Sequence, residues 1–508
     1  MARADYFDRA LQAARDVLER FNPEAFLQAI DNHCVGIAFD GSIAQPEGAA
    51  AVDLSIRLIA RFYPSIALIA MDATAKRHLR RLAGLAKAIN PLIDISHESD
   101  LASDIVVIGR RVLPVRSDQR VLYAGSEGWI ARLSRHGPVG SGTSGNPLGA
   151  GAAACLATAN IFRGVFTGAS LDDYIEFSVL NLDPSRLPEE NPSLEKTQIG
   201  QVFLVGAGAI GNGFLWALAR APVHGELAVV DHDSLDLGNL QRYVLSLRAE
   251  VGQPKAQLAQ ALFKRHPSVA VYPVPCTWED FVTAQPEQRW RFERVVVALD
   301  TANDRIGVQA SLPRWIVNGW TRDSSLGVSR HAFLGEDACM ACLYVPRREV
   351  PHEDEIIAQA LGFPPEQLRL VRELIETGRP LDRHLLDQIS AARQVPPEQL
   401  QPFEGRGIRE LYTKAVCSGT VMKLALGPAT AHADVPMPFQ SALAGILQAA
   451  ALFIHAGGLP PNPTITEIDL MRSFPPTSHF SRPERKATDH CFCVDPVFQE
   501  AYQAKYLS

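Results

Sequence analysis

Short apolar runs alternate with longer amphipathic stretches along most of this chain. The apolar runs that predict strands lie at residues 35–39, 65–71 and 104–109 in the first part and at 201–205, 226–231 and 294–300 in the second. Between them, apolar residues recur at helical spacing. Strands that alternate with helices indicate an α/β fold with parallel sheets.

The second part of the chain repeats features of the first. Two long stretches of small and apolar residues, 145–163 and 439–454, each predict a buried helix. We interpret the repetition as a degenerate internal duplication, in which the first copy kept the fold and lost its site; the alternative is an unrelated α/β domain. A stretch rich in Pro, Glu and Ser at 183–197 is expected to be the linker. Short helical patterns separated by Pro-Pro and Gly-Arg-Pro predict a helical insertion at 345–412.

One strand in the second part ends in a glycine-rich turn. Gly206, Gly208 and Gly211 follow the apolar run QVFLV and open an Ala/Leu-rich helical stretch. A strand, glycine turn and helix in this order let the backbone approach a phosphate at a helix N-terminus. Asp231 closes the next strand, 20 residues after Gly211 (231 − 211). A carboxylate at this distance normally binds a ribose hydroxyl, so a nucleotide site is expected here. A dehydrogenase would fit this much equally well.

The residues that follow Asp231 favour a triphosphate over a dinucleotide. Asn239, Arg242 and Lys255 add hydrogen-bond donors and positive charge behind the ribose carboxylate. Asp300, at the end of the run RVVVALD, has the place of a magnesium ligand, and Arg305 lies just behind it.

Taken together, these motifs resemble the ubiquitin-activating superfamily, whose ThiF/MoeB-like members include the bacterial sulfur-carrier adenylyltransferases. The shared pattern is GxGxxG, then DxD with NLxR, then a Lys in GxxKA, then an Asp after a strand. The matching positions here are Gly206, Gly208, Gly211, Asp231, Asp233, Asn239, Arg242, Lys255, Asp300 and, in DTANDR, Arg305. The resemblance is firm over about residues 195–342 and fainter to 475. It implies adenylation of the C-terminal glycine of a ubiquitin-like protein with ATP and magnesium, with Arg242, Lys255 and Asp300 as catalytic residues.

The resemblance also gives a domain arrangement. It implies an inactive adenylation-like domain at 1–182, an active adenylation domain at 198–344 that resumes at 413–508, and the insertion between them. The enzymes most similar in this respect are two-half bacterial activating enzymes of ubiquitin-like conjugation operons linked to phage defence. Such a chain would act as a monomeric pseudo-dimer or as a homodimer. Whether an arginine of the first part, such as Arg110, Arg132 or Arg135, reaches the phosphates stays open.

Cys417, in LYTKAVCSGTVMK, lies where the resemblance would place a thioester-forming cysteine. Such a thiol attacks the acyl-adenylate and passes the carrier to a ubiquitin-conjugating-type enzyme. Lys414 and Lys423 would favour its thiolate. The alternative is a buried structural cysteine.

Two further cysteine pairs predict a zinc site. Cys339 and Cys342 form CxxC, and Cys491 and Cys493 form CxC near the C-terminus. Two close thiolate pairs suit one tetrahedral zinc ion. Superfamily members often have CxxC in both places. A CxC pair holds its two thiolates in a tighter bite than a CxxC pair, because one residue fewer separates them. A redox pair or free thiols are the alternatives.

Composition excludes several other classes of protein. The chain has 508 residues, of which 47% are hydrophobic and 21% charged, with a formal net charge of −7. These values predict an ordinary globular protein of two or three domains with no basic surface for nucleic acid. The first 21 residues predict an amphipathic helix without a signal-peptide core. No run of about 18 uninterrupted apolar residues suggests a membrane span. The cysteines suit a reducing compartment, so a cytoplasmic location is expected.

Three competing functions stay open from the sequence. The first is a sulfur-carrier adenylyltransferase without a thioester step, in which Cys417 is structural. The second is an NAD-binding dehydrogenase, against which Asn239, Arg242 and Lys255 argue. The third is a scaffold that keeps the fold without catalysis.

Overall fold

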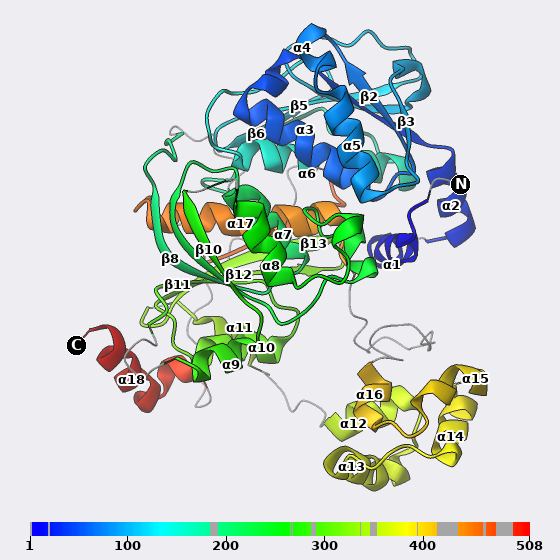
Figure 1. Ribbon diagram of the computed structural model, residues 1–508, viewed down its shortest axis with the longest axis vertical. Coiled ribbons are helices and arrows are strands. Elements are labelled where there is room, and N and C mark those ends of the chain that lie inside the picture. Colours follow the sequence, from blue (N-terminus) through cyan, green and yellow to red (C-terminus); the bar gives the residue numbers. More distant parts are fainter. Residues whose placement is uncertain are drawn as a thin grey trace. The chain divides into compact units, whose positions relative to one another are not determined.

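The computed structural model describes residues 3–18, 21–182, 191–264, 266, 268–285, 291–335, 337–345, 353–393, 395–413, 435–460, 464–473 and 491–507. The chain forms two compact units (Figure 1). The larger unit comprises Met1–Val345 and Val435–Ser508, and the smaller one is Pro346–Asp434.

A seven-stranded sheet organises the first part of the larger unit. Its strands are β1 (Cys34–Phe39), β2 (Ser65–Ala70), β3 (Asp94–Ser96), β4 (Asp104–Ile108), β5 (Arg120–Glu127), β6 (Ile130–Ser134) and β7 (Tyr174–Ser178). Their order is β3-β2-β1-β4-β5-β6-β7. The strands from β3 to β5 are parallel, and β6 and β7 are antiparallel to their neighbours.

A second seven-stranded sheet repeats this arrangement. Its strands are β8 (Gln198–Val205), β9 (His224–Val230), β10 (Val269–Val274), β11 (Arg294–Val297), β12 (Trp315–Arg322), β13 (Ser325–Ala332) and β14 (Ile465–Asp469). The order β10-β9-β8-β11-β12-β13-β14 places each strand where its counterpart lies in the first sheet. The change from parallel to antiparallel pairing also falls at the same point. The structure thus confirms an α/β protein with two related halves.

Helices cover the sheets. In the first half they are α1 (Phe7–Val17), α2 (Pro23–Asp31), α3 (Pro46–Ile59), α4 (Ala73–Lys76), α5 (Leu79–Ile89) and α6 (Leu148–Phe166). In the second half they are α7 (Ala209–Leu218), α8 (Lys255–Phe263), α9 (Trp278–Thr283), α10 (Ala302–Ala310), α11 (Met340–Tyr344), α17 (Pro438–Ala456) and α18 (Pro496–Tyr506).

The two 19-residue apolar helices join the halves in one core. Helix α6 packs on β5 and β6 and against α17, which packs on β12, β13 and α7 (Figure 1). A Cβ atom on Gly445 of α17 would lie 2.2 Å from the Ile210 carbonyl oxygen of α7, so glycine permits this close approach. Both helices are long and apolar enough to cross a membrane, yet 94% of the 18-residue apolar window in α6 and 89% of that in α17 are buried within the protein. Their apolar character therefore serves the core between the halves.

The smaller unit consists of short helices with a core of their own. They are α12 (Glu353–Leu361), α13 (Leu368–Thr377), α14 (Arg383–Arg393), α15 (Pro397–Leu400) and α16 (Ile408–Leu411). Leucine, isoleucine and valine side chains fill the space between them. Their helical spacing was the sequence signal for this insertion.

Part of the expected linker lies outside the described residues, which resume at 191. From there the chain lies against the first half: the Trp129 indole donates to the Pro192 carbonyl at 2.7 Å, and the Trp129 amide donates to the Asn191 side chain at 3.1 Å.

Candidate active site

The glycine turn joins β8 to α7, and its three glycines have different surroundings. A Cβ atom on Gly206, whose φ is 92°, would lie 2.5 Å from the Ala298 carbonyl oxygen, and one on Gly211 would lie 2.3 Å from the Gly206 carbonyl oxygen. The nearest atom to a Cβ on Gly208 is the Tyr243 hydroxyl oxygen, at 3.4 Å. Gly206 and Gly211 are therefore required by the fold, whereas Gly208 leaves space for a ligand.

Asp231 follows β9 and braces this turn. One carboxylate oxygen accepts the Ala207 amide at 2.7 Å, and the other accepts the Asp233 amide at 2.9 Å. The side chain is buried, and it lines the cavity described next. The carboxylate thus holds the turn in shape and remains beside the site where a ribose is expected.

A cavity of about 850 Å³ opens at the carboxyl ends of β8, β9 and β11. Ligands of open α/β sheets bind at this edge, and the volume suits a nucleotide. Its lining includes six of the residues expected from the sequence: Gly206, Gly208, Asp231, Asp233, Lys255 and Asp300. Trp278, Val282 and Val205 give the cavity an apolar wall.

Lys255, the first residue of α8, supplies a positive charge to this cavity. Its ammonium group donates to Asp233 at 2.7 Å and lies 5.5 Å from the centre of the Tyr243 ring. Burial opposes its charge, but Tyr243, Asp231 and Asp233 raise its pKa above the usual value. Burial likewise acts to raise the pKa of Asp233, but the hydrogen bond and charge of Lys255 bring it below the usual value. The pair is therefore charged at neutral pH.

Arg242 and Asn239 belong to the loop after β9 and lie outside the residues that line the cavity. The Asn239 side chain accepts the Asp236 amide at 3.0 Å and so caps a short 3-10 helix, Leu237–Gln241. The Arg242 guanidinium lies 5.5 Å from the centre of the Tyr243 ring. Burial lowers its pKa, while Tyr243 and Asp300 act in the opposite direction.

Asp300 and Arg305 have contrasting environments. Asp300 is exposed at the cavity, where a single carboxylate suits Mg²⁺, because this ion keeps several waters and phosphate oxygens as ligands. Arg305 is buried in α10 and donates to the carbonyls of Leu299 and Gly319 and, at 2.7 Å, to the Tyr344 hydroxyl. Its donors therefore hold the backbone beside Asp300, and it lies outside the cavity lining.

Sequence reasoning missed two residues near this site. Tyr243 has its hydroxyl beside Gly208 and its ring 5.5 Å from both Arg242 and Lys255, yet a lone tyrosine in a loop carries no motif. Arg9, on α1 of the first half, lies over the 3-10 helix: a Cβ atom on Gly238 would be 3.3 Å from its Nε atom. Its positive charge also lowers the pKa of Arg242. Two of the three arginines considered from the first half have partners in that half: Arg132 pairs with Glu127 and Glu176, and Arg135 pairs with Asp173.

The corresponding edge of the first sheet holds a carboxylate where the second has its glycine turn. Asp40 follows β1 as Gly206 follows β8. The Asp40 carboxylate accepts the amides of Arg110 at 2.6 Å and Arg111 at 3.1 Å. A Cβ atom on Gly109 would lie 2.2 Å from it. Its negative charge would repel a phosphate at this edge of the first sheet.

The four expected zinc ligands come together in one buried cluster. All four Sγ atoms lie within 4.8 Å of one another. The CxxC pair, Cys339 and Cys342, is separated by 3.7 Å and the CxC pair, Cys491 and Cys493, by 3.3 Å. Cys342 and Cys491, from the two pairs, are 2.9 Å apart. Four converging thiols fit a structural zinc site.

The remaining cysteines differ in exposure. Cys417 lies outside the described residues. Cys155 is fully buried in α6, and burial raises the pKa of its thiol. Burial also raises the pKa of Cys34 and of Cys276, and Cys276 lines the nucleotide cavity.

Comparison with known families gives two matches. Residues 183–473 match the family model described as "ThiF family", and this match spans more than half of the chain. Residues 38–167 match the model described as "Prokaryotic E2 family C". The second match covers most of the first half, whose sheet has the same strand order as the ThiF-matching half.

Three similar proteins illustrate these matches. The "Uncharacterized protein y4jF" of Sinorhizobium fredii is 41% identical over 514 residues, which cover 100% of this chain and 98% of that protein. The "Sulfur carrier protein adenylyltransferase" of Thermus thermophilus is 32% identical over 219 residues, or 39% of this chain and 79% of that protein. The "NEDD8-activating enzyme E1 catalytic subunit" of Schizosaccharomyces pombe is 30% identical over 133 residues, or 26% of this chain and 29% of that protein.

Proposed function

The chain belongs to the ThiF family, within the ubiquitin-activating superfamily, and from this premise we propose that it is an ATP-dependent adenylyltransferase. Its substrate would be the C-terminal carboxylate of a ubiquitin-like or sulfur-carrier protein. The observation that carries the proposal is the cavity at the ends of β8, β9 and β11, which collects the glycine turn, the three predicted carboxylates Asp231, Asp233 and Asp300, and a buried lysine in one place. The similar enzymes from Thermus and Schizosaccharomyces are named for activities of this kind.

Different residues around the cavity would contact different parts of the nucleotide. Gly208 allows the backbone to approach the phosphates, and Asp231 faces the ribose. Lys255 supplies positive charge from α8, and Arg242 and Arg9 add positive charge behind Tyr243. Electrostatic stabilisation of this kind, in a preorganised site, is a large part of catalysis of phosphoryl chemistry.

The reaction needs little from the protein beyond positioning and charge. The carrier carboxylate is already a nucleophile; one of its oxygens forms a bond to the α-phosphorus, and the bond from that phosphorus to pyrophosphate breaks. Magnesium, held by Asp300, would neutralise negative charge on the phosphates. Arg305 would act by fixing the backbone at Leu299, next to Asp300.

A thioester step would follow in the full proposal. Cys417 would attack the acyl-adenylate, release AMP, and pass the carrier to a ubiquitin-conjugating-type enzyme of a bacterial defence operon. This step rests on the sequence position of Cys417. In the competing proposal, sulfur-carrier activation, the adenylate itself is the product and Cys417 is structural.

The first half would assist rather than catalyse. In the turn after β1, which corresponds to the glycine turn, the Asp40 carboxylate accepts the Ser42 amide at 2.9 Å, where a phosphate would otherwise bind. Cys155 is the one cysteine between residues 38 and 167, and a fully buried thiol with a raised pKa is a poor nucleophile for a thioester. We therefore propose that this half serves as a pseudo-subunit. The cysteine cluster would hold zinc, which ties the C-terminal segment to the adenylation domain.

A gel assay with three proteins tests these proposals. Wild type, Cys417→Ala and Asp300→Ala are incubated with ATP, magnesium and a ubiquitin-like protein that ends in glycine and is encoded beside this chain. ATP–pyrophosphate exchange is measured in parallel, and products are separated with and without reducing agent. We expect exchange in wild type and Cys417→Ala but not in Asp300→Ala, and a thiol-sensitive adduct in wild type alone.

The other outcomes separate the competing functions. Exchange without any adduct favours sulfur-carrier activation. An adduct that survives in Cys417→Ala places the thioester on another cysteine. A wild-type protein that neither binds ATP nor exchanges pyrophosphate contradicts the adenylyltransferase proposal.

A further inference from the structure

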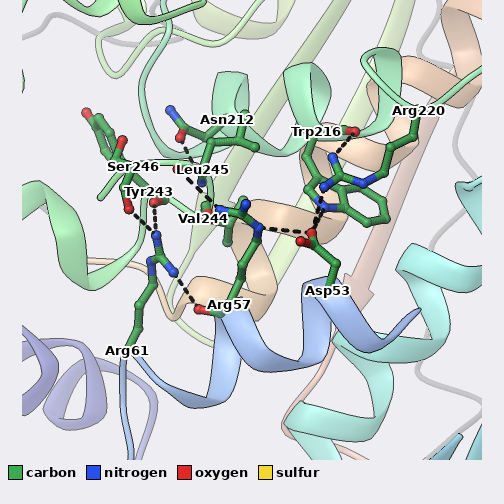
Figure 2. A network of polar contacts seen from close by, with 10 residues as sticks. All are labelled: Asp53, Arg57, Arg61, Asn212, Trp216, Arg220, Tyr243, Val244, Leu245 and Ser246. Atoms are coloured by element: carbon green, nitrogen blue, oxygen red, sulfur yellow. Dashed lines mark hydrogen bonds and ion pairs between the residues drawn. The ribbon is translucent and has the colours of Figure 1, made fainter. Parts of the chain in front are cut away.

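Two arginines of the first half bind four consecutive backbone carbonyls of the second. Arg57 lies on α3 and Arg61 lies in the turn just after it, and the carbonyls belong to residues 243–246 (Figure 2). Arg57 Nη1 donates to the carbonyls of Val244 at 3.0 Å and Leu245 at 3.2 Å. Arg61 Nη2 donates to those of Tyr243 at 2.7 Å and Ser246 at 2.6 Å.

These carbonyls need partners from elsewhere in the fold. Residues 243–246 follow the 3-10 helix and form neither helix nor strand. Tyr243, Val244 and Ser246 are buried, so water cannot satisfy their carbonyl groups. Within the segment, only the Ser246 amide reaches back to one of them, the Tyr243 carbonyl, at 3.0 Å. The remaining hydrogen bonds to these carbonyls in the described structure come from Arg57 and Arg61.

The same segment contacts the residues that are expected to lie near the phosphates. The Tyr243 ring centre lies 5.5 Å from the Arg242 guanidinium and 5.5 Å from the Lys255 ammonium. The Leu245 amide donates to the Asn212 side chain at 3.2 Å, and the Asn212 amide group donates to the carbonyls of the glycine turn at residues 207 and 208, at 2.9 and 3.0 Å. A displacement of 243–246 would therefore move the cations and the glycine turn together.

We propose that Arg57 and Arg61 are positioning residues for the nucleotide site: they fix residues 243–246 so that the first half determines the affinity of the second for the phosphates of ATP. This inference rests on the proposed adenylyltransferase function. It gives the degenerate half a definite task, although that half has no phosphate cradle of its own.

Asp53 orients Arg57 and also binds Arg220, which provides a matched control. Its Oδ2 atom accepts hydrogen bonds from Arg57 Nε at 2.9 Å, Trp216 Nε1 at 2.9 Å and Arg220 Nη2 at 2.7 Å (Figure 2). Arg220, on α7, thus belongs to the same interface and to the same ion-pair network. Its other hydrogen bond goes to the carbonyl of Trp216, not to residues 243–246.

The test measures ATP·Mg²⁺ and AMP binding by calorimetry for the full-length wild type, Arg61→Met, Arg61→Lys and Arg220→Met, with thermal unfolding of each. A small misplacement of binding groups by a distant mutation is costly, so Arg61→Met is expected to weaken ATP binding by about tenfold or more. AMP lacks the two outer phosphates, so its affinity should fall less than that of ATP. Lysine cannot reproduce the guanidinium fork, so the ATP affinity of Arg61→Lys should lie between those of wild type and Arg61→Met. Arg220→Met should keep ATP affinity within about twofold, despite the lost ion pair.

Each other result has a definite meaning. Wild-type ATP affinity in folded Arg61→Met, or an equal loss in Arg220→Met, overturns the positioning role. An equal loss of ATP and AMP affinity would also overturn it, because that is general loosening of the interface. If Arg61→Met does not fold, Arg61→Lys decides in the same way. If wild type binds no ATP, the proposed function itself fails, and this inference fails with it.

Discussion

Gly208, the N-cap of α7, and Gly211, in the first turn of that helix, should respond differently to the same substitution. Gly211→Ala places a methyl group 2.3 Å from the Gly206 carbonyl oxygen, which is 0.7 Å inside the 3.0 Å limit that real Cβ contacts respect (3.0 − 2.3). A backbone oxygen cannot rotate away. The strain should cost about 1–3 kcal/mol of unfolding free energy, as overpacking of a core usually does.

Gly208→Ala should leave the fold intact. Its Cβ would make an ordinary 3.4 Å contact with the Tyr243 hydroxyl, and its φ of −70° suits any residue. Alanine also restricts the unfolded chain, so the free energy of unfolding should stay within about 1 kcal/mol of wild type. The methyl group would instead occupy the space in which the backbone approaches the phosphates. ATP binding should weaken by at least about tenfold, or about 1.4 kcal/mol.

Urea denaturation without nucleotide and calorimetry with ATP·Mg²⁺ measure the two effects separately. The expected pattern is a lower denaturation midpoint for Gly211→Ala and a normal midpoint with weak ATP binding for Gly208→Ala. Wild-type ATP affinity in Gly208→Ala would refute the assignment of this glycine to the ligand. A normal midpoint in Gly211→Ala would refute the packing argument for the third glycine.

Two further predictions concern the interface and the cysteine cluster. Although burial acts to raise the pKa of Asp53, the charges of Arg220 and Arg57 and the Trp216 hydrogen bond lower it to about 2 from the usual 3.8. The carboxylate therefore contributes stability above pH 3.8 that is lost as the pH falls through 2. Between pH 5 and pH 2, urea unfolding of wild type should lose about 2 kcal/mol more than that of Asp53→Asn; parallel curves would contradict the ion-pair network. Wild type should bind about one zinc ion per chain, measured by mercurial release. Cys493→Ser should bind less and Cys276→Ser should not change; a zinc-free wild type would contradict the structural metal site.

Much of the fold could be predicted from local sequence patterns. The alternation of apolar runs and helical stretches gave the α/β class, because strand and helix periodicities depend on neighbouring residues. The long helices α6 and α17 stood out for the same reason, and their similarity pointed to two halves with the same topology, which the matching strand orders confirm. The strands β5–β7 and β12–β14, with their antiparallel pairs, were not anticipated from the patterns.

The candidate site was partly readable for the same reason. Gly206, Gly208, Asp231 and Lys255 follow one another along a single βαβ region, so their spacing alone brings them to one edge of the sheet. Arg305 shows the limit of such reasoning. Its place in the motif does not reveal which way it points, and packing of α10 directs its guanidinium to backbone carbonyls.

What the sequence by itself determined are the features that neighbouring residues encode: the α/β rhythm, the duplicated helices, the glycine turn with its carboxylate and lysine, and two cysteine pairs. Tertiary structure alone decided that Cys342 and Cys491, 149 positions apart, meet at 2.9 Å. It also decided that the Asp40 carboxylate accepts the Arg110 amide at the edge of the first sheet. The same holds for Arg61, which binds carbonyls 182 and 185 positions further along the chain. These contacts join elements whose mutual placement comes from the shared core, and no local pattern records which partner a buried charge will find.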